Sequence, residues 1–153
     1  MVLELLDKEY SIYKFNVKHQ IDTNIFNNDF MSITKTKDET SIVAISGSLE
    51  NFDKKEDGWK IFKINGVLDF SLIGIISKIS TILANGGISV FVISTYNTDY
   101  IMVKKNNIEE AIKIFEKNNY VIEKKMNKKP AHNRSVTASP PYGGSGYEKP
   151  QSG

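Results

Sequence analysis

The sequence contains no cysteine. This absence excludes a disulfide framework, a thiolate zinc site and a cysteine nucleophile. The two histidines, His19 and His132, are too few and too far apart in the chain to predict a metal site. No carboxylate pair has the spacing of a catalytic acid and base, and no glycine-rich loop opens a helix in the way that phosphate binding requires. We therefore predict no catalytic residues, no metal and no cofactor.

Long apolar runs are also missing. No run approaches the roughly 20 residues that a membrane-spanning helix needs. The segment Met1–Glu9 interrupts its apolar residues with charge almost at once, unlike a secretory signal or a membrane anchor. These features predict a cytoplasmic protein without a membrane partner.

Proline is confined to the end of the chain, because all four prolines follow Lys129. Residues 127–153 are rich in serine, glycine and proline, so they cannot bury enough apolar surface to offset the entropy of ordering them. We predict that they form a disordered tail, whose composition also fits appended sequence. The tail has four basic residues and one acidic residue, whereas the whole chain carries a net charge of +2. The remainder is therefore almost neutral, which argues against a nucleic-acid partner.

Residues 59–126 alternate between strand and helix signals. Apolar residues at helical spacing predict one helix that begins at Asp69 or Ser71, and Asn85–Gly87 ends it. A second helix is predicted to begin at Asn106 or Asn107. The predicted strands are residues 59–65, the long apolar strand 88–95, which has the composition of a central strand, its hairpin partner 100–104, and 120–123. The order βαββαβ predicts two helices on one face of a four-stranded antiparallel sheet.

The first half of the chain follows a weaker version of this plan. A strand is predicted over residues 10–17, a helical turn over 22–26, and a hairpin from residues 30–36 and 41–46. A charged loop is predicted over residues 53–58. We therefore expect an α+β protein with two ferredoxin-like units in tandem. Residues 1–58 would form a first unit with eroded helices, residues 59–126 the second unit, and residues 127–153 the tail.

Three stretches of the second half resemble a known family. They are Gly66–Gly74, Ala84–Phe91 and Ile93–Val103, and residues 30–43 add a weaker likeness in the first half. These stretches look like tandem ACT-domain proteins, and more narrowly like the small bacterial group related to the CASTOR arginine sensors. The resemblance implies ACT-like units in a regulatory protein that binds an amino acid where two units meet. It also implies a homodimer and an unidentified regulated protein as a further partner.

On this resemblance, the ligand-binding residues are those at the opening of the first helix and at the end of the facing strand. They are Asp69, Phe70, Ser71, Ile93, Ser94, Thr95 and Asp99. Each has a plainer interpretation. Asp69 could cap a helix, with its carboxylate on free backbone N–H groups, and residues 94–99 could be simple turn chemistry. In the first half, Ser32, Thr34 and Thr36 share one face of a strand, which could be solvated or could form a polar wall between the units.

The functional prediction is a non-catalytic sensor of a small molecule, most simply an amino acid. Asp69 would accept the α-ammonium group of the ligand, helix-opening N–H groups would bind its carboxylate, and Asp99 would suit a cationic side chain. A purely structural interaction domain without a ligand is the first alternative. An RNA-binding module is less favoured because the body lacks positive charge. An acylphosphatase-like enzyme is disfavoured because the sole arginine, Arg134, lies in the tail.

Overall fold

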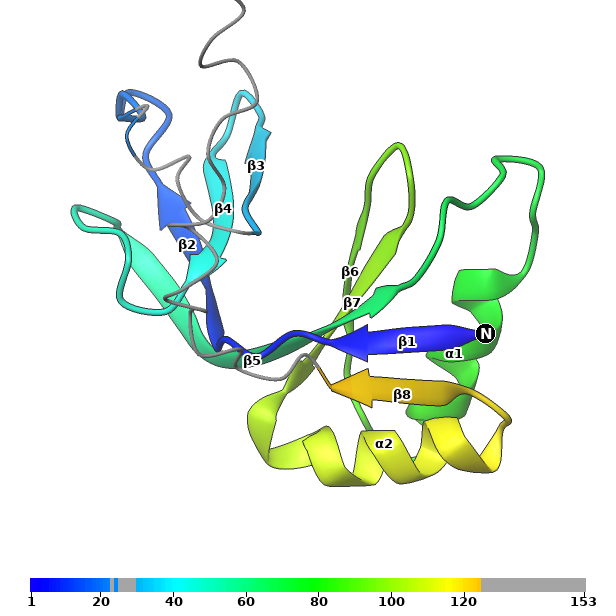
Figure 1. Cartoon of the computed structure of the whole chain (residues 1–153). Coiled ribbons are helices and arrows are strands. Elements are labelled where there is room, and N and C mark those ends of the chain that lie inside the picture. Colours follow the sequence, from blue (N-terminus) through cyan, green and yellow to red (C-terminus); the bar gives the residue numbers. More distant parts are fainter. Residues whose placement is uncertain (23, 25–29, 125–153) are drawn as a thin grey trace, which may run out of the picture.

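A computed structural model describes residues 1–22, 24 and 30–124 of the chain. Within these residues, eight strands form one branched sheet, accompanied by two α-helices and a short 3₁₀ segment (Figure 1). The strands are β1 (Val2–Leu5), β2 (Tyr10–Phe15), β3 (Ser32–Lys35), β4 (Thr40–Ile45), β5 (Lys54–Ile64), β6 (Phe91–Ser94), β7 (Asp99–Lys104) and β8 (Val121–Lys124). The helices are α1 (Ile75–Asn85) and α2 (Ile108–Lys117), and the 3₁₀ segment is η2 (Lys105–Asn107). Among the described residues, no helix is long and apolar enough to span a membrane.

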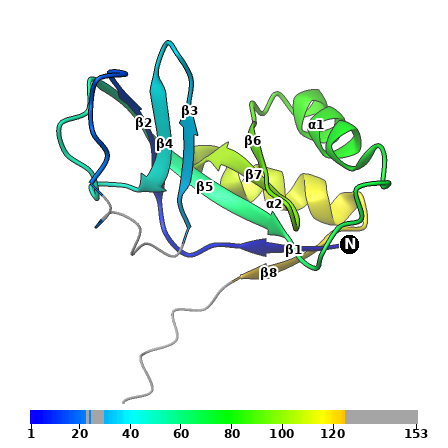
Figure 2. The ribbon, with the colours of Figure 1, turned by 90° about the horizontal axis from the view of Figure 1, so that it is seen from above.

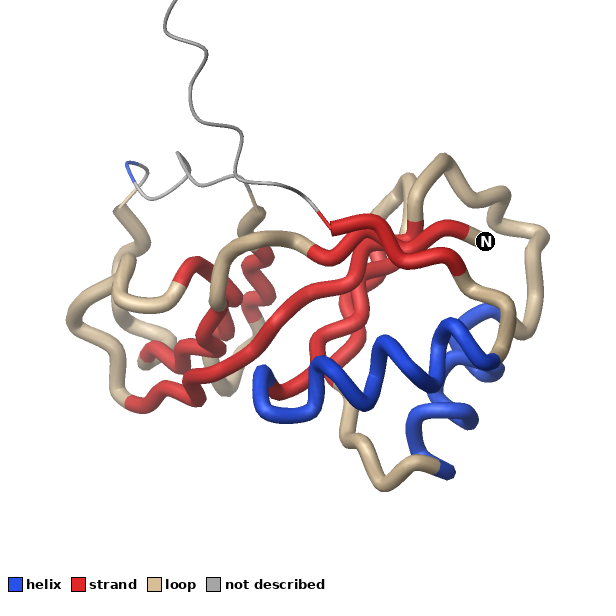
Figure 3. The backbone as a smooth tube through the Cα atoms, turned by 60° about the horizontal axis from the view of Figure 1, so that its bottom comes forward, coloured by secondary structure: helices blue, strands red, loops and turns tan. Residues whose placement is uncertain are grey.

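The second half of the chain has the predicted α+β, ferredoxin-like organisation. Both helices cover the same face of the sheet formed by β6, β7, β5, β1 and β8 (Figure 3). The apolar stripe of α1 buries Ile79 and Leu83, and that of α2 buries Ala111 and Phe115. These side chains pack on inward-facing strand residues in one core, which includes Leu3, Phe62, Ile64, Ile101 and Val103. The helical periodicity of the sequence thus produces the buried layer.

The prediction of a four-stranded, fully antiparallel sheet was wrong in one respect. The N-terminal strand β1 lies between β5 and β8, antiparallel to the first and parallel to the second. The predicted unit boundary at residue 58 also falls inside β5, which pairs with β2 at its start and with β1 and β7 at its end. Strand β1 has only four residues, and its partner β8 lies more than 100 positions away in the sequence. No local sequence pattern therefore predicts β1.

The first half forms an arm of strands β3, β4 and β2, which joins the rest of the sheet through the start of β5 (Figure 2). Its hairpin β3–β4 matches the sequence prediction. Tyr10, Phe30 and Val43 pack toward the second half, against Trp59 and Met102. The opposite face carries a separate cluster, with Tyr13, Phe15, Ile42, Ala44 and Leu49 as its buried members. The helical turn expected at residues 22–26 lies largely outside the described residues.

Helix α1 begins later than the sequence indicated. Its first residue is Ile75, and the preceding Gly74 has a left-handed φ of 81°, which a continuing right-handed helix cannot contain. Neither Asp69 nor Ser71 is therefore its cap. The end of α1 matches the prediction, because the Ile88 N–H donates to the Leu83 carbonyl and the Gly87 N–H to that of Ala84, with Gly87 at φ 74°. Helix α2 also forms as predicted, but Asn107 makes no side-chain capping bond.

Two strand predictions also need correction. The charged segment 54–57, expected to be a loop, is the start of β5, where it pairs with β2 and leaves its side chains exposed. Strand β6 is shorter than residues 88–95, and in the described part of the chain it pairs with β7 alone. It is therefore an edge strand. Its apolar composition reflects side chains such as Ile93, which packs toward the arm.

Candidate ligand-binding site

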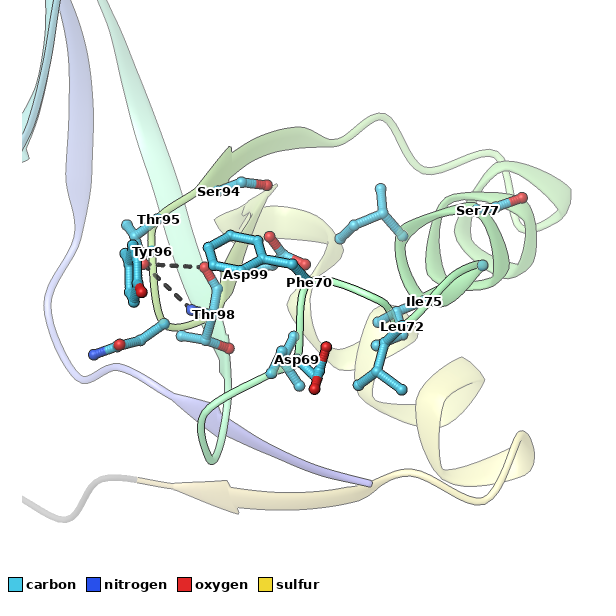
Figure 4. A pocket seen from close by; sticks show the side chains of 14 residues that line it. Asp69, Phe70, Leu72, Ile75, Ser77, Ser94, Thr95, Tyr96, Thr98 and Asp99 are labelled. Carbon is cyan, nitrogen blue, oxygen red and sulfur yellow. Dashed lines mark hydrogen bonds between the residues drawn. The ribbon is translucent and has the colours of Figure 1, made fainter.

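A cavity of about 320 Å³ lies between the segment 68–77 and the β6–β7 hairpin (Figure 4). One wall is the loop that enters α1 together with the first residues of that helix. The other wall is the end of β6, the turn and the first residue of β7. The lining residues are Leu68, Asp69, Phe70, Leu72, Gly74, Ile75, Ile76, Ser77, Ser94, Thr95, Tyr96, Asn97, Thr98 and Asp99. Its volume is in the range of small-molecule pockets.

Five of the seven predicted site residues line this cavity: Asp69, Phe70, Ser94, Thr95 and Asp99. The other two lie outside it. Ser71 contacts the site indirectly, because its backbone N–H donates to the Asp69 carboxylate at 2.7 Å. Ile93 lines a different groove, on the side of β6 that faces the arm. The fold therefore brings together both sequence stretches that carried the ligand-binding prediction.

The carboxylate of Asp69 organises its own loop. It accepts the hydrogen bond from Ser71 N–H, while the Asp69 carbonyl accepts one from Leu72 N–H at 3.0 Å. Hydrogen bonds from the Ser71 side chain and backbone hold the pKa of Asp69 below its ordinary value. The local turn thus occupies the carboxylate partly and keeps it ionised, so that it remains available to a cationic group.

The opening of α1 supplies the opposite polarity. Gly74, Ile75, Ile76 and Ser77 line the cavity, and this helix start has no side-chain cap and no acidic residue in its first turn. Backbone N–H groups at a helix start lack intrahelical partners and attract anions. One end of the same cavity wall therefore offers a carboxylate, and the other offers N–H donors.

The hairpin wall is fixed by hydrogen bonds. The Thr95 hydroxyl donates to the Thr98 carbonyl at 3.1 Å (Figure 4). The Thr95 N–H donates to the same carbonyl at 2.9 Å. The buried Thr98 hydroxyl donates to the Ile64 carbonyl at the end of β5, and Leu68 N–H donates to the Asn97 carbonyl at 2.7 Å. The last bond ties the two cavity walls together.

Large apolar side chains surround the cavity and remain exposed. Phe70 is 74% exposed and Tyr96 is 80% exposed, and their rings meet edge to face at 5.1 Å. Val67, Leu72 and Ile73, close to Phe70 in the chain, are also exposed, and we call these five residues the apolar rim. Sequence reasoning did not assign Tyr96 or the start of α1 to the site. Tyr96 could have been assigned from the sequence, because it lies in the turn between the predicted site residues Thr95 and Asp99. The start of α1 could not, because it depends on the φ of Gly74.

The arm does not reach the cavity. Every lining residue from the described part of the chain falls between Leu68 and Asp99, so the strands of the arm contribute nothing to the cavity. Ser32 and Thr34 of the arm instead line the groove that includes Ile93. No basic side chain of residues 1–22, 24 and 30–124 lines the cavity, whereas Asp69 and Asp99 both do. Among the described residues, no group of three or more histidine and carboxylate side chains is placed to hold a metal ion.

Comparison with known proteins agrees with this description. The family model of the ACT domain matches residues 54–117, and a second model, described as an N-terminal domain, matches residues 8–50. No curated protein matches the chain.

Solved structures show the same fold. Protein Atu0741 from Agobacterium tumefaciens is 27% identical, covers 82% of this chain and 93% of its own, and superposes with a TM-score of 0.74. The regulatory subunit of aspartate kinase from Thermus thermophilus is 12% identical, with a TM-score of 0.54, and the match covers 72% of this chain and 92% of that subunit. The aspartokinase alpha and beta subunits are 13% identical, with a TM-score of 0.58 and coverage of 76% and 96%. The chain accordingly has an α+β, ACT-like fold, and its residues 54–117 match the ACT domain family.

Proposed function

We propose that this protein is a non-catalytic regulatory protein that binds an amino acid in the cavity between the segment 68–77 and the β6–β7 hairpin. One observation carries the proposal: a single cavity wall presents the Asp69 carboxylate and the uncapped start of α1. These two groups have the polarity that the α-ammonium and α-carboxylate groups of an amino acid require. The match to the ACT domain supports a regulatory role.

In the proposed complex, Asp69 accepts hydrogen bonds from the ligand ammonium group. The N–H groups of Ile75, Ile76 and Ser77 donate to its carboxylate, because these positions precede the first residue with an intrahelical partner, Lys78. Ser94, Thr95 and Asp99 face the ligand side chain from the hairpin. The narrower kinship with the group related to the CASTOR arginine sensors is part of this proposal and rests on residues 93–100.

A panel of the twenty amino acids in thermal unfolding experiments tests the proposal. An amino acid present at about 100 times its Kd adds about 2.7 kcal/mol to the free energy of unfolding. Asp69→Asn should abolish that stabilisation, because it removes the charge and retains the shape. Asp38→Asn, in the exposed β3–β4 turn, is the matched control and should retain the full effect. Indifference of the wild-type protein to all twenty would contradict the proposal.

The exposed apolar rim supports a second part of the proposal, namely that the protein forms a homodimer. Isolated apolar residues are common on surfaces, but contiguous ones at a cavity mouth mark interaction sites. We infer that a second copy covers Phe70, Ile73 and Tyr96, thereby closing the cavity. Sedimentation velocity should show a dimer that Ile73→Ser weakens, whereas Val121→Ser, an exposed apolar residue on β8, should not. A dimer without any response to amino acids would favour the alternative of a structural interaction domain.

A further inference from the structure

A second hollow, distinct from the ligand cavity, separates the two outer strands β3 and β6. It has a volume of about 350 Å³, and we call it the β3–β6 groove. Its lining residues are Ser32, Ile33, Thr34, Ser41, Val43, Phe91, Val92, Ile93 and Ser94. Consecutive residues from both strands line it, so backbone as well as side chains faces the hollow. None of these nine described residues is charged.

The hydrogen-bond register shows which backbone N–H and C=O groups of β6 do not bond to β7. Thr95 N–H bonds to the Thr98 carbonyl, so residues 95 and 98 form a hydrogen-bonded pair. Antiparallel pairs alternate, and hence Ile93 and Phe91 bond to β7 while the N–H and C=O groups of Val92 and Ser94 point away from it. Val92 and Ser94 both line the groove. The same alternation, starting from the bond of Thr36 N–H to the Glu39 carbonyl, turns the backbone of Ile33 on β3 outward.

Strand β6 also lacks the residue types that commonly protect a sheet edge, and its short length is the protection that it retains. Strand β6 contains no charged residue, proline or glycine, and β3 carries charge at Lys35 alone. Natural edge strands commonly use such residues to prevent pairing with another chain. Opposite β6, the hydroxyl-bearing residues Ser32, Thr34 and Ser41 form a polar wall on the arm. Backbone groups on one side, hydroxyls on the other and apolar side chains between them match an extended peptide.

We propose that the β3–β6 groove binds an extended segment of a partner protein, which adds to β6 as an antiparallel strand. Backbone bonds to Val92 and Ser94 supply affinity, and alternate apolar side chains of the segment pack on Phe91 and Ile93. Five successive antiparallel pairings separate β3 from β6, so the two strands run in opposite directions. A single added strand can therefore be antiparallel to only one of them. Because it pairs with β6, strand β3 contacts it mainly through side chains. The segment is short, with about four residues in contact, as are both strands.

A phage-displayed library of random heptapeptides, selected on the full chain, tests this proposal. Enriched sequences should alternate β-branched or aromatic residues with polar ones, and synthetic versions should compete with one another. Two versions of each peptide should then be compared, one methylated on the odd-numbered backbone nitrogens and one on the even-numbered nitrogens. One version should lose binding and the other should retain it, because only one of the two sets of amides faces β6. Absence of any enriched sequence, or an equal loss of binding in both methylated versions, would overturn the proposal.

A substitution in the protein gives an independent measurement. Val92→Pro removes an outward N–H without removing a bond to β7, and proline is tolerated on edge strands. It should weaken peptide binding by roughly tenfold, as expected for loss of a backbone bond and of the neighbouring contact. Lys124→Pro, at the outer end of β8, is the matched control and should leave binding unchanged. Equal weakening by both substitutions would overturn the proposal. So would a change of oligomeric state in Val92→Pro without a loss of peptide affinity, since it would assign β6 to a second copy.

Discussion

The Thr98 hydroxyl donates a hydrogen bond of 2.7 Å to the carbonyl of Ile64, across 34 positions of sequence. Both groups are buried, and the bond fastens the tip of the β6–β7 hairpin to the end of β5. Thr98 also accepts both hydrogen bonds from Thr95 through its carbonyl. Thr98 therefore helps to fix the hairpin wall of the cavity through both its hydroxyl and its carbonyl.

Thr98→Val should destabilise the protein by about 1–3 kcal/mol, because the substitution removes a buried hydroxyl donor from its acceptor. Urea unfolding at constant m value measures the loss. Thr98→Ser retains the donor and should recover much of the stability. Equal stability of the valine variant and the wild type would show that the bond contributes nothing.

The pKa of Asp69 should lie below the ordinary aspartate value of 3.8, because the side chain and backbone of Ser71 stabilise its ionised form. The stabilisation is present above the ordinary pKa and is lost as the pH falls through the lowered pKa of the folded state. Nuclear magnetic resonance titration of the carboxyl carbon measures the value directly. Ser71→Ala should raise the pKa of Asp69 without restoring it completely, since the backbone N–H remains. No change would show that the serine side chain has no part in the shift.

Gly87→Ala should destabilise the protein by about 1–2 kcal/mol, because Gly87 has a φ of 74° and ends α1 in the left-handed region. A Cβ at this position would meet no atom within 4 Å, so the penalty arises from the backbone alone. Gly87→Asn is the control, since asparagine tolerates this conformation, and thermal unfolding should rank it above the alanine variant. The reverse order would contradict the assignment.

The two proposed sites should influence each other, because Ser94 lines both the cavity and the β3–β6 groove. An amino acid that stabilises the protein should change the Kd of a selected heptapeptide, and the peptide should change the amino-acid Kd by the same factor. Isothermal titration in both orders measures the two factors. Identical affinities with and without the other ligand would show that the sites are independent.

The elements that the sequence predicted well are those defined by local patterns. The stripes of α1 and α2 follow from apolar residues at helical spacing, and Gly87 stops α1 through a left-handed backbone conformation that glycine adopts easily. The proximity of Asp69 to Thr95 followed from the family resemblance, and both residues line the cavity.

The features that the sequence did not predict depend on distant partners. Strand β1 is positioned by β5 and β8 rather than by its own four residues, and the charged start of β5 is a strand because β2 pairs with it. The late start of α1 depends on the positive φ of Gly74, so the helix-opening N–H groups belong to Ile75–Ser77 and not to the residues beside Asp69. The apolar residues of β6 suggested a central strand, but apolar side chains can equally face a neighbouring arm.

The central claim is that the segment 68–77 and the hairpin 94–99 hold an amino acid together. Backbone amide spectra of the labelled protein, recorded with each of the twenty amino acids in turn, test it most directly. The account predicts that at least one amino acid shifts the amides of Ile75–Ser77 together with those of Ser94–Asp99, and that Asp69→Asn abolishes both sets of changes. Saturable shifts confined to other parts of the chain, or no saturable shift with any of the twenty, would contradict it.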